Sequence, residues 1–351
     1  MYTLGIDLHK KSSVWILIDA QRTEIWKEDV LCSPTYISTI IKSLPVAPAE
    51  IQVAIEPVGG WRWVTELLSA SGMQVHTAHP RKIQLIAQSN KKTDTEDART
   101  LANLLLAGYF PEAHKVNEEI YQLRLLLRER TFIIQKRTSV KNQIHGIATT
   151  QGLHLIDGGN PLFKKGKVDI MKGDNFVLKQ LHYLIEDLDK RVIPFNEQLL
   201  LESKKHPLTQ LLMTFPGVGI ITALTIIAEV GDFGRFSSGK KLASFAGLVP
   251  RQRSSGESVR YGSITHAGSA QLRTALVETA MRIRVSNAPE LYSFVQRLTK
   301  AATAKKARVA LARKIAVIMW KMVLTNTPYQ TNIVPSVCTT NLSNLDTEAG
   351  T

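Results

Sequence analysis

The chain has 351 residues, 44% of them hydrophobic, which is enough for two or three domains with buried cores. The sequence contains no run of about 18 apolar residues, so it predicts no transmembrane helix. Polar and charged residues come too early in the N-terminus for a signal peptide. Two cysteines favour neither a disulfide framework nor a zinc site, so we expect a cytoplasmic protein in a reducing setting.

The net charge of +14 is concentrated in one part of the chain. Residues 206–330 carry 17 Lys and Arg against 5 Asp and Glu, whereas residues 1–111 carry 11 of each kind. A concentrated basic surface is typical of proteins that neutralise nucleic-acid phosphates. A surface that only keeps the chain in solution, or that meets an acidic membrane, is the alternative reading. Nucleic acid is the partner that we expect.

Residues 1–112 have the pattern of a layered α/β domain. Apolar runs at 2–7 and 14–19 predict a β-hairpin, and those at 51–57 and 73–79 predict two more strands, each stopped by a proline. Helices are expected over 63–72 and from Asp94 onward. Strands that alternate with helices indicate the α/β class.

The remainder of the chain is predicted to be mainly helical. Residues 113–205 hold two long amphipathic patterns around a loop at 157–167, which fits an antiparallel hairpin, an interrupted coiled coil or a plain bundle layer. Residues 206–326 read as helices with Gly-rich turns. Residues 327–351 are polar and without periodicity, so we expect a disordered tail.

Two pairs of acids are candidates for a metal site. Asp94 and Asp97 stand three apart at the start of a helical run, so they share a face, although capping of the helix is an alternative role. Asp7 and Glu56 stand in or at the end of apolar strands, where a carboxylate is costly unless it is paired or bound to a cation. Four convergent carboxylates would bind two Mg²⁺ ions.

Other polar residues of this region are read as structural. Asp19 ends a strand and precedes a turn. His9 and His76 are set aside because Mg²⁺ prefers oxygen donors.

The basic block contains two further motifs. Pro216-Gly217-Val218-Gly219 lies between two apolar helical runs, as in a helix-hairpin-helix, where Gly217 and Gly219 let backbone N–H groups approach a phosphate. A tight turn without a ligand explains the same residues. Further on, arginines that could hold a phosphodiester surround Ser254-Ser255-Gly256, which is otherwise a polar turn. They are Arg251, Arg253, Arg260 and Arg273.

Taken in order, these motifs resemble a known family. "GIDLHK", "AIEPVGG", "KTDTEDA", "FPGVGIITA" and "FAGLVPRQRSSGESVRYGSITHAGSAQLRTAL" are similar to the DEDD-type insertion-sequence transposases, a family that includes pilin-gene DNA invertases. The resemblance covers about residues 1–325. It implies a ribonuclease-H-like domain of the RuvC type, a helical coiled-coil insert with dimer contacts, and a C-terminal transposase domain.

The resemblance also implies roles for single residues and partners. Asp7, Glu56, Asp94 and Asp97 match the four acids, and Ser255 matches the nucleophilic serine, with Ser254 as an extra neighbour. The serine would attack DNA, form a 5′-phosphoserine link and exchange strands through a Holliday-junction-like intermediate.

The expected partners are donor and target double-stranded DNA, a structured non-coding guide RNA and further copies in a dimer or tetramer. We expect no membrane partner. The expected location is the bacterial cytoplasm, on the nucleoid when active. Ser255 is far along the chain from the acids, so a reaction site that combines them could form within one chain or between subunits. The alternative is a RuvC-like junction nuclease that uses water as its nucleophile. A non-catalytic nucleic-acid binder would have no use for the four acids.

Overall fold

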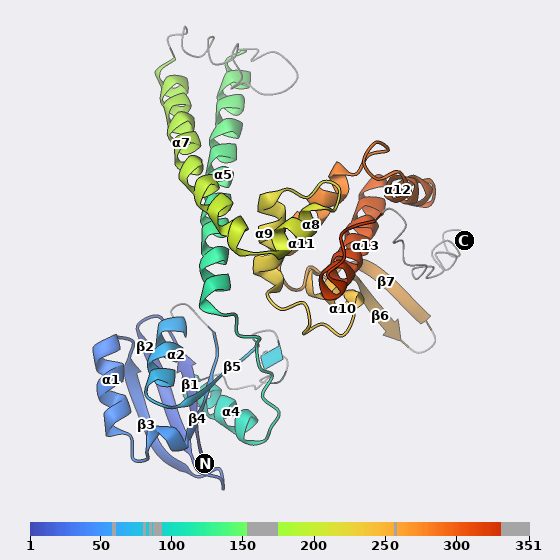
Figure 1. Cartoon of the computed structure of the whole chain (residues 1–351). Helices are drawn as coiled ribbons and strands as arrows, with labels where there is room; N and C mark the ends of the chain where they lie inside the picture. Colours follow the sequence, from blue (N-terminus) through green and yellow to red (C-terminus); the bar gives the residue numbers. More distant parts are fainter. Residues whose placement is uncertain are drawn as a thin grey trace. The chain divides into compact units, whose positions relative to one another are not determined.

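The computed structural model describes residues 1–57, 61–79, 82–83, 86, 93–152, 175–255 and 258–330, with the side chains of 253–261 and 301 outside the description. The expected loop at 157–167 and most of the expected tail also lie outside it. The chain divides into two compact units, Met1–Val116 and Asn117–Thr351, which are described separately (Figure 1). In the described part of the chain, no helix has the length and apolarity that crossing a membrane requires.

The first unit is built on a five-stranded sheet. Its strand order is β3-β2-β1-β4-β5, with β1, β2 and β3 antiparallel and β4 and β5 parallel to β1. The strands are β1 (Tyr2–Leu8), β2 (Ser12–Ile18), β3 (Glu24–Leu31), β4 (Ile51–Ile55) and β5 (Gln74–Thr77). The helices are α1 (Pro34–Ser43), a short 3-10 turn η1 (Pro48–Glu50), α2 (Trp61–Ala70) and α4 (Asp94–Leu106).

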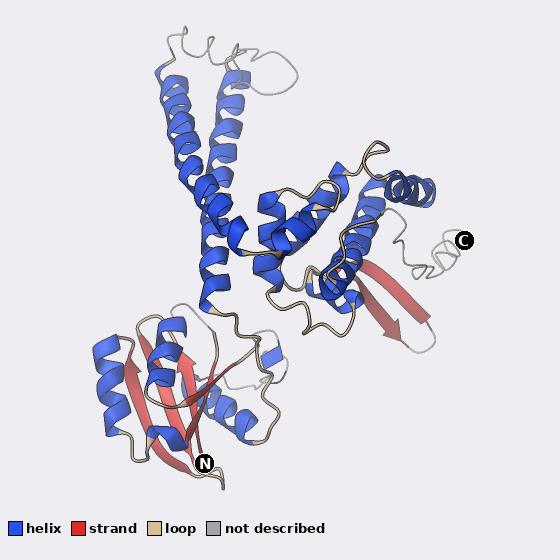
Figure 2. Cartoon of the chain, viewed as in Figure 1, coloured by secondary structure: helices blue, strands red, loops and turns tan. Residues whose placement is uncertain are grey.

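Helices cover both faces of this sheet (Figure 2). The apolar sides of α1 and α2 pack on one face, over a core that includes Ile6, Trp15 and Ile55. Helix α4 packs on the other face, where Ala98 and Leu101 meet small and branched strand residues. The mixed α/β architecture that we predicted is therefore confirmed, whereas β3 and α1 were not predicted.

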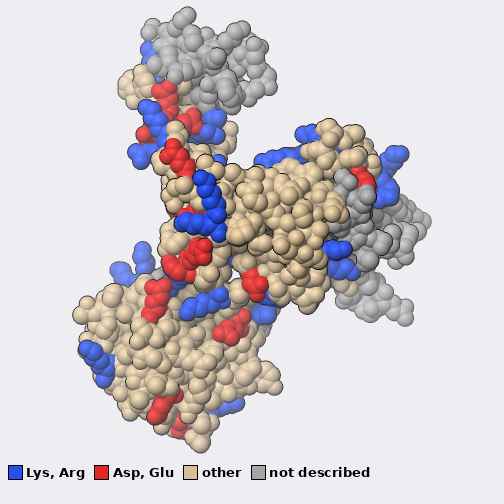
Figure 3. All heavy atoms as spheres, viewed as in Figure 1, with Lys and Arg blue, Asp and Glu red and all other residues tan. Residues whose placement is uncertain are grey.

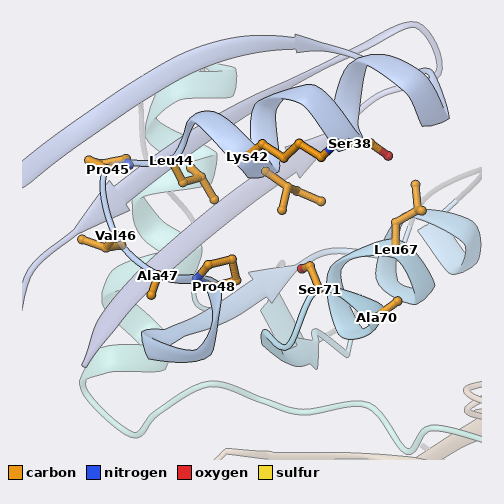
Figure 4. A pocket seen from close by; sticks show the side chains of 11 residues that line it. Ser38, Lys42, Leu44, Pro45, Val46, Ala47, Pro48, Leu67, Ala70 and Ser71 are labelled. Atoms are coloured by element: carbon orange, nitrogen blue, oxygen red, sulfur yellow. The ribbon is translucent and has the colours of Figure 1, made fainter.

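A shallow groove lies on the α1 and α2 side of the sheet (Figure 4). Residues from α1, the loop at 44–48 and the end of α2 line it, and Lys42 is their one charged side chain. The candidate acids belong to the opposite side, with α4, so the groove is not part of the site described below.

The second unit is mainly helical. Two long helices, α5 (Glu118–Thr150) and α7 (Phe176–Lys205), run antiparallel, because Ile144 near the end of α5 packs on Leu178 near the start of α7. The other helices share one apolar core around Phe215 and Met319. They are α8 (Leu208–Met213), α9 (Ile220–Val230), α10 (Gly239–Phe245), α11 (Ala270–Arg282), α12 (Pro289–Ala301) and α13 (Ala304–Thr325).

Two features of this unit differ from the sequence prediction. A β-hairpin, β6 (Pro250–Ser255) and β7 (Ser258–Ile264), stands within the region that we expected to be mainly helical. Tyr329, in the segment expected to be disordered, packs its ring 4.7 Å from that of Phe215, and its backbone N–H donates to Thr214. The predicted tail therefore begins too early, because an aromatic anchor carries no periodicity that a sequence pattern would reveal.

Candidate metal centre and nucleic-acid surface

The strand register brings Asp7 and Glu56 to the same end of the sheet. β1 and β4 are parallel and pair Ile6 with Ile55, so Asp7 and Glu56 are the next residues on the two neighbouring chains. Ile6 and Ile55 belong to the core beneath α1 and α2. Since side chains alternate along a strand, positions 7 and 56 face the other side, where α4 lies.

The first turn of α4 supplies the other two acids. Thr93 caps this helix by accepting a hydrogen bond from the backbone N–H of Glu96 at 3.2 Å, so Asp94 and Asp97 lie in its first turn. Carboxylates there also suit the helix dipole, and the capping role coexists with a role in a site. Asp94 is exposed and Asp97 half-buried. The ends of β1 and β4 and the first turn of α4 thus carry the four predicted acids, and two of them, Asp7 and Asp94, belong to one cluster of possible metal ligands.

His9 joins two of these acids, although we had set it aside as structural. Its Nε2 lies 3.2 Å from Asp7 Oδ2 and 3.2 Å from Asp94 Oδ2. One ligand atom from each of the three residues falls within 4.8 Å of the others, which is close enough for a single cation. The sequence does hold a signal for it, since His9 is two residues after Asp7 and so shares its face of the chain.

The electrostatics of Asp7 favour a positive charge beside it. Burial raises the pKa of the Asp7 carboxyl, and the nearby Asp94 and Asp97 carboxylates raise it further, while His9 opposes both. A buried carboxylate among like charges is stabilised by a cation. Oxygen donors with at most one imidazole suit a divalent metal ion such as Mg²⁺ or Mn²⁺. The residues present therefore fit the metal site that the sequence predicts, with Glu56 half-buried at the same edge.

Asp19 and His76, which we read as structural, make local contacts within this unit. Asp19 Oδ1 accepts hydrogen bonds from the backbone N–H groups of Gln21 and Thr23 in a turn. His76 Nδ1 lies 3.1 Å from Glu112 Oε1 and away from the acids of α4.

The serine motif is located at the tip of the β6–β7 hairpin. The strands pair Ser255 with Ser258 and Arg253 with Arg260, and residues 256–257 between them lie outside the described residues. Because alternate positions share a face of a strand, positions 253, 255, 258 and 260 fall on one face of the ribbon and position 254 on the other. Arg251, near the start of β6, is exposed.

Two residues predicted to contact nucleic acid also make contacts inside the fold. Gly217 has φ +82°, and a Cβ there would come 2.9 Å from Arg282 Cβ, so this glycine lets α11 approach the turn before α9. Arg273 Nη1 donates to the Ala246 carbonyl at 3.0 Å. Gly219, at the N-terminus of α9, has open space in front of it. The space in front of Gly219 is what an approaching phosphate would require, so its predicted contact stays a prediction.

Charged side chains differ in their distribution over the second unit. In the face shown in Figure 3, acidic and basic side chains mix along α5 and α7, whereas Lys and Arg predominate over the helices that follow. This agrees with the excess of Lys and Arg in residues 206–330.

Comparison with known proteins places the chain in a family. The DEDD model described as "Transposase" matches residues 4–150, and the model described as "Transposase IS116/IS110/IS902 family" matches residues 209–296. The chain belongs to the DEDD transposases of insertion sequences. Both matches contain candidate residues: Asp7, Glu56, Asp94 and Asp97 fall in the first, and Ser255 in the second.

Individual relatives of this transposase family agree with the models. The transposase for insertion sequence element IS1111A of Coxiella burnetii is 28% identical over 93% of this chain and 91% of its own length. The transposase for insertion sequence element IS1328 of Yersinia enterocolitica is 27% identical over 76% and 82%. The pilin gene-inverting protein of Moraxella bovis is 36% identical over a shorter part, 35% of this chain and 39% of its own length.

Proposed function

We propose that this transposase cleaves and exchanges DNA strands in a reaction that depends on divalent metal ions, with Ser255 as the nucleophile. The observation that carries the proposal is the convergence of Asp7, Asp94 and His9 within 4.8 Å, at the edge of the sheet where Glu56 and Asp97 also lie. Asp7, Glu56, Asp94 and Asp97 would hold two Mg²⁺ ions. When bound, such ions polarise phosphate oxygens and stabilise the charge that develops in phosphoryl transfer.

The sheet supports a ribonuclease-H-like fold of the RuvC type for the first unit. Three antiparallel strands followed by two parallel strands, in the order β3-β2-β1-β4-β5, put acids from β1, the end of β4 and α4 at one edge. The protein's part in the reaction is to aim these carboxylates at one point, where a bound cation would favour their ionised form. Burial of Asp7 on the α4 side excludes water from part of this point.

The hairpin supports Ser255 rather than Ser254 as the reacting serine. Position 255 shares its face of the ribbon with the positions of Arg253 and Arg260, which would bind a phosphodiester, whereas position 254 is on the opposite face. The Ser255 oxygen would bond to the phosphorus, and the P–O3′ bond would break. The 3′ oxygen leaves with a proton, and the 5′ phosphate stays on the serine. A 3′-hydroxyl of the recipient strand would then attack this phosphoserine and release the serine hydroxyl.

Partners beyond DNA are proposed on the resemblance to the family. A structured non-coding guide RNA would select donor and target, and strand exchange would require a dimer or tetramer. The arm formed by α5 and α7 gives one observation in favour of self-association. It exposes large apolar side chains that a second copy would cover. They include Phe132, Tyr183, Ile193, Leu200 and Leu201.

Trapping of the covalent intermediate tests the proposed function. The full chain is incubated with a labelled DNA carrying the ends of its insertion sequence, with its RNA and Mg²⁺, then digested and examined by mass spectrometry. We expect DNA on the peptide that contains Ser255, and none in Ser255→Ala. An adduct that persists in Ser255→Ala and disappears in Ser254→Ala would move the nucleophile by one residue. Metal-dependent cleavage without any adduct would favour the water-using nuclease.

A further inference from the structure

Arg235 differs from most other arginines of the second unit, because the Nε of its guanidinium group is buried and has no acceptor in the described part of the chain. It lies in the loop between α9 and α10, which is anchored by the buried rings of Phe233 and Phe236. Its Nε is buried without an acceptor, and among the described residues no carboxylate or carbonyl pairs with this side chain. Nine other arginines among the described residues of the unit donate to backbone or side-chain oxygens: Arg124, Arg128, Arg130, Arg137, Arg191, Arg273, Arg282, Arg284 and Arg308.

Two aromatic rings hold this guanidinium in place. Its central carbon lies 4.3 Å from the ring centroid of Phe236 and 4.6 Å from that of Phe245, and the two rings are themselves 5.4 Å apart. The Phe236 carbonyl accepts a hydrogen bond from Trp320 Nε1 at 3.2 Å, which fixes the backbone beside Arg235. Cation–π contact orients the planar group but supplies no counter-charge.

The surroundings of Arg235 add positive charge and little that opposes it. Burial and the nearby Arg124 both lower the pKa of Arg235, and Asp232 opposes them only in part. Asp232 Oδ1 accepts from the Gly234 backbone N–H at 2.7 Å, and no ion pair joins Asp232 to Arg235. An arginine stays charged at neutral pH, so the fold carries a half-buried cation whose desolvation is not compensated within the described residues.

We propose that Arg235 is a phosphate-binding residue, which receives a phosphodiester of the nucleic acid on the loop between α9 and α10. A phosphate oxygen pair matches the two Nη groups, which are not buried as Nε is, and a pre-oriented guanidinium loses less freedom on binding than a mobile one. Exposed Lys240 and Lys241 follow in the first turn of α10 and extend the basic surface. The proposal rests on the proposed DNA-binding function and adds a contact outside the hairpin and the turn before α9.

Salt-dependent binding of the full chain to a labelled DNA duplex tests this inference. Arg235→Met removes the charge and keeps an apolar side chain against the two rings. Loss of one phosphate contact should make the log–log salt slope about 0.9 shallower and weaken binding about fivefold at 0.15 M salt. Lys136→Met is the matched control, since Lys136 is exposed in α5, outside residues 206–330, and its Nζ lies 5.1 Å from the Phe132 ring centroid. This control should leave the slope unchanged.

Stability measurements separate a phosphate contact from a packing role. Thermal unfolding of Arg235→Met should occur at or above the wild-type temperature, because an uncompensated cation is removed. Inorganic phosphate should raise the melting temperature of wild type more than chloride of equal ionic strength, and this difference should vanish in the variant. Arg235→Gln, which keeps a planar polar end beside the rings, takes the place of Arg235→Met should the latter fail to fold.

Three outcomes decide the matter. An unchanged salt slope with lowered melting temperature would overturn the inference and make Arg235 a packing residue. An unchanged slope at unchanged stability would overturn it as well, and would leave an acidic protein segment as the partner to seek. Failure of the wild-type chain to bind DNA at all would instead reject the proposed function.

Discussion

Gly5 of β1 lies directly against the backbone of Ala98 in α4. A Cβ at position 5 would come within 1.9 Å of the Ala98 carbonyl oxygen and 3.0 Å of the Ala102 Cβ. This close approach keeps the first turn of α4 next to the end of β1, two residues beyond Gly5. The absence of one side chain therefore determines how near Asp94 and Asp97 come to Asp7.

Gly5→Ala should move α4 away from the sheet. The added methyl group meets backbone, which cannot rotate away, so we expect the free energy of unfolding to fall by about 1–3 kcal/mol. The affinity for Mn²⁺, measured by calorimetric titration, should also fall in Gly5→Ala. Gly146→Ala is the control, since nothing lies within 4 Å of a Cβ in that α5 position. It should stabilise the chain by roughly 0.5–1 kcal/mol. Equal metal affinity in both variants would show that the approach of α4 does not set the site.

Alanine at any of the four acids should remove DNA recombination without unfolding the protein. Each of Asp7→Ala, Glu56→Ala, Asp94→Ala and Asp97→Ala deletes a ligand for the cation, so we expect strand cleavage to fall at least about 100-fold. Thermal unfolding is measured on the same samples, with Glu28→Ala, on the exposed side of β3, as the control. If three of the four variants recombine at the wild-type rate, the proposal of a four-acid metal site is wrong.

Stability should depend on pH through Asp7. Burial, with Asp94 and Asp97 close by, raises the pKa of Asp7 above its ordinary value of 3.8. Its contribution to stability is therefore fully present below that value and is lost as the pH rises through the higher pKa of the folded protein. In EDTA, Asp7→Asn should melt at a higher temperature than wild type at pH 7 and at about the same temperature near pH 3. A variant that melts lower at pH 7 would refute this sign.

A divalent ion should reverse the order of the melting temperatures of wild type and Asp7→Asn at pH 7. Mg²⁺ at millimolar concentration should raise the melting temperature of wild type at pH 7, because a cation bound only to the folded state stabilises it. Asp7→Asn should show little or no such rise. Equal rises in both proteins would place the bound ion elsewhere.

Glu229 should be a structural acid of the second unit. Its carboxylate is buried between Arg128 Nη2 at 3.1 Å and the Ser269 hydroxyl at 2.8 Å, which joins α5 to the start of α11. Glu229→Ala leaves both donors without their acceptor, so the free energy of unfolding should fall by about 1–3 kcal/mol in denaturant titrations. The exposed pair of Glu278 with Arg282 offers a comparison. Glu278→Ala should change the free energy of unfolding by about 0.5 kcal/mol or less. Similar losses in both variants would contradict a special role for the buried acid.

Much of the first unit could be predicted because its strands are apolar and stopped by prolines or turns. β3 was missed since its side chains are mostly exposed, with Val30 as its one buried residue. Asp7 and Glu56 were predicted from their places in apolar strands, and Asp94 and Asp97 from their spacing at a helix start. The contacts of His9 with Asp7 and Asp94 depend on how β1 and α4 meet, which no local pattern encodes. Gly217 shows a second limit of prediction from sequence. A glycine needed for close approach looks the same in sequence whether a phosphate or, as here, a helix comes near it.

Iron-directed cleavage of the polypeptide tests the metal centre most directly, because it locates a bound cation without requiring DNA or activity. Fe²⁺ takes the place of Mg²⁺ and, with ascorbate and peroxide, produces hydroxyl radicals that cut the nearby backbone. We predict cuts near residues 7–9, 56 and 94–97 that excess Mg²⁺ suppresses and that Asp7→Asn abolishes. Cuts that cluster elsewhere in the chain, or cuts at these positions that Mg²⁺ leaves unchanged, would contradict the four-acid site.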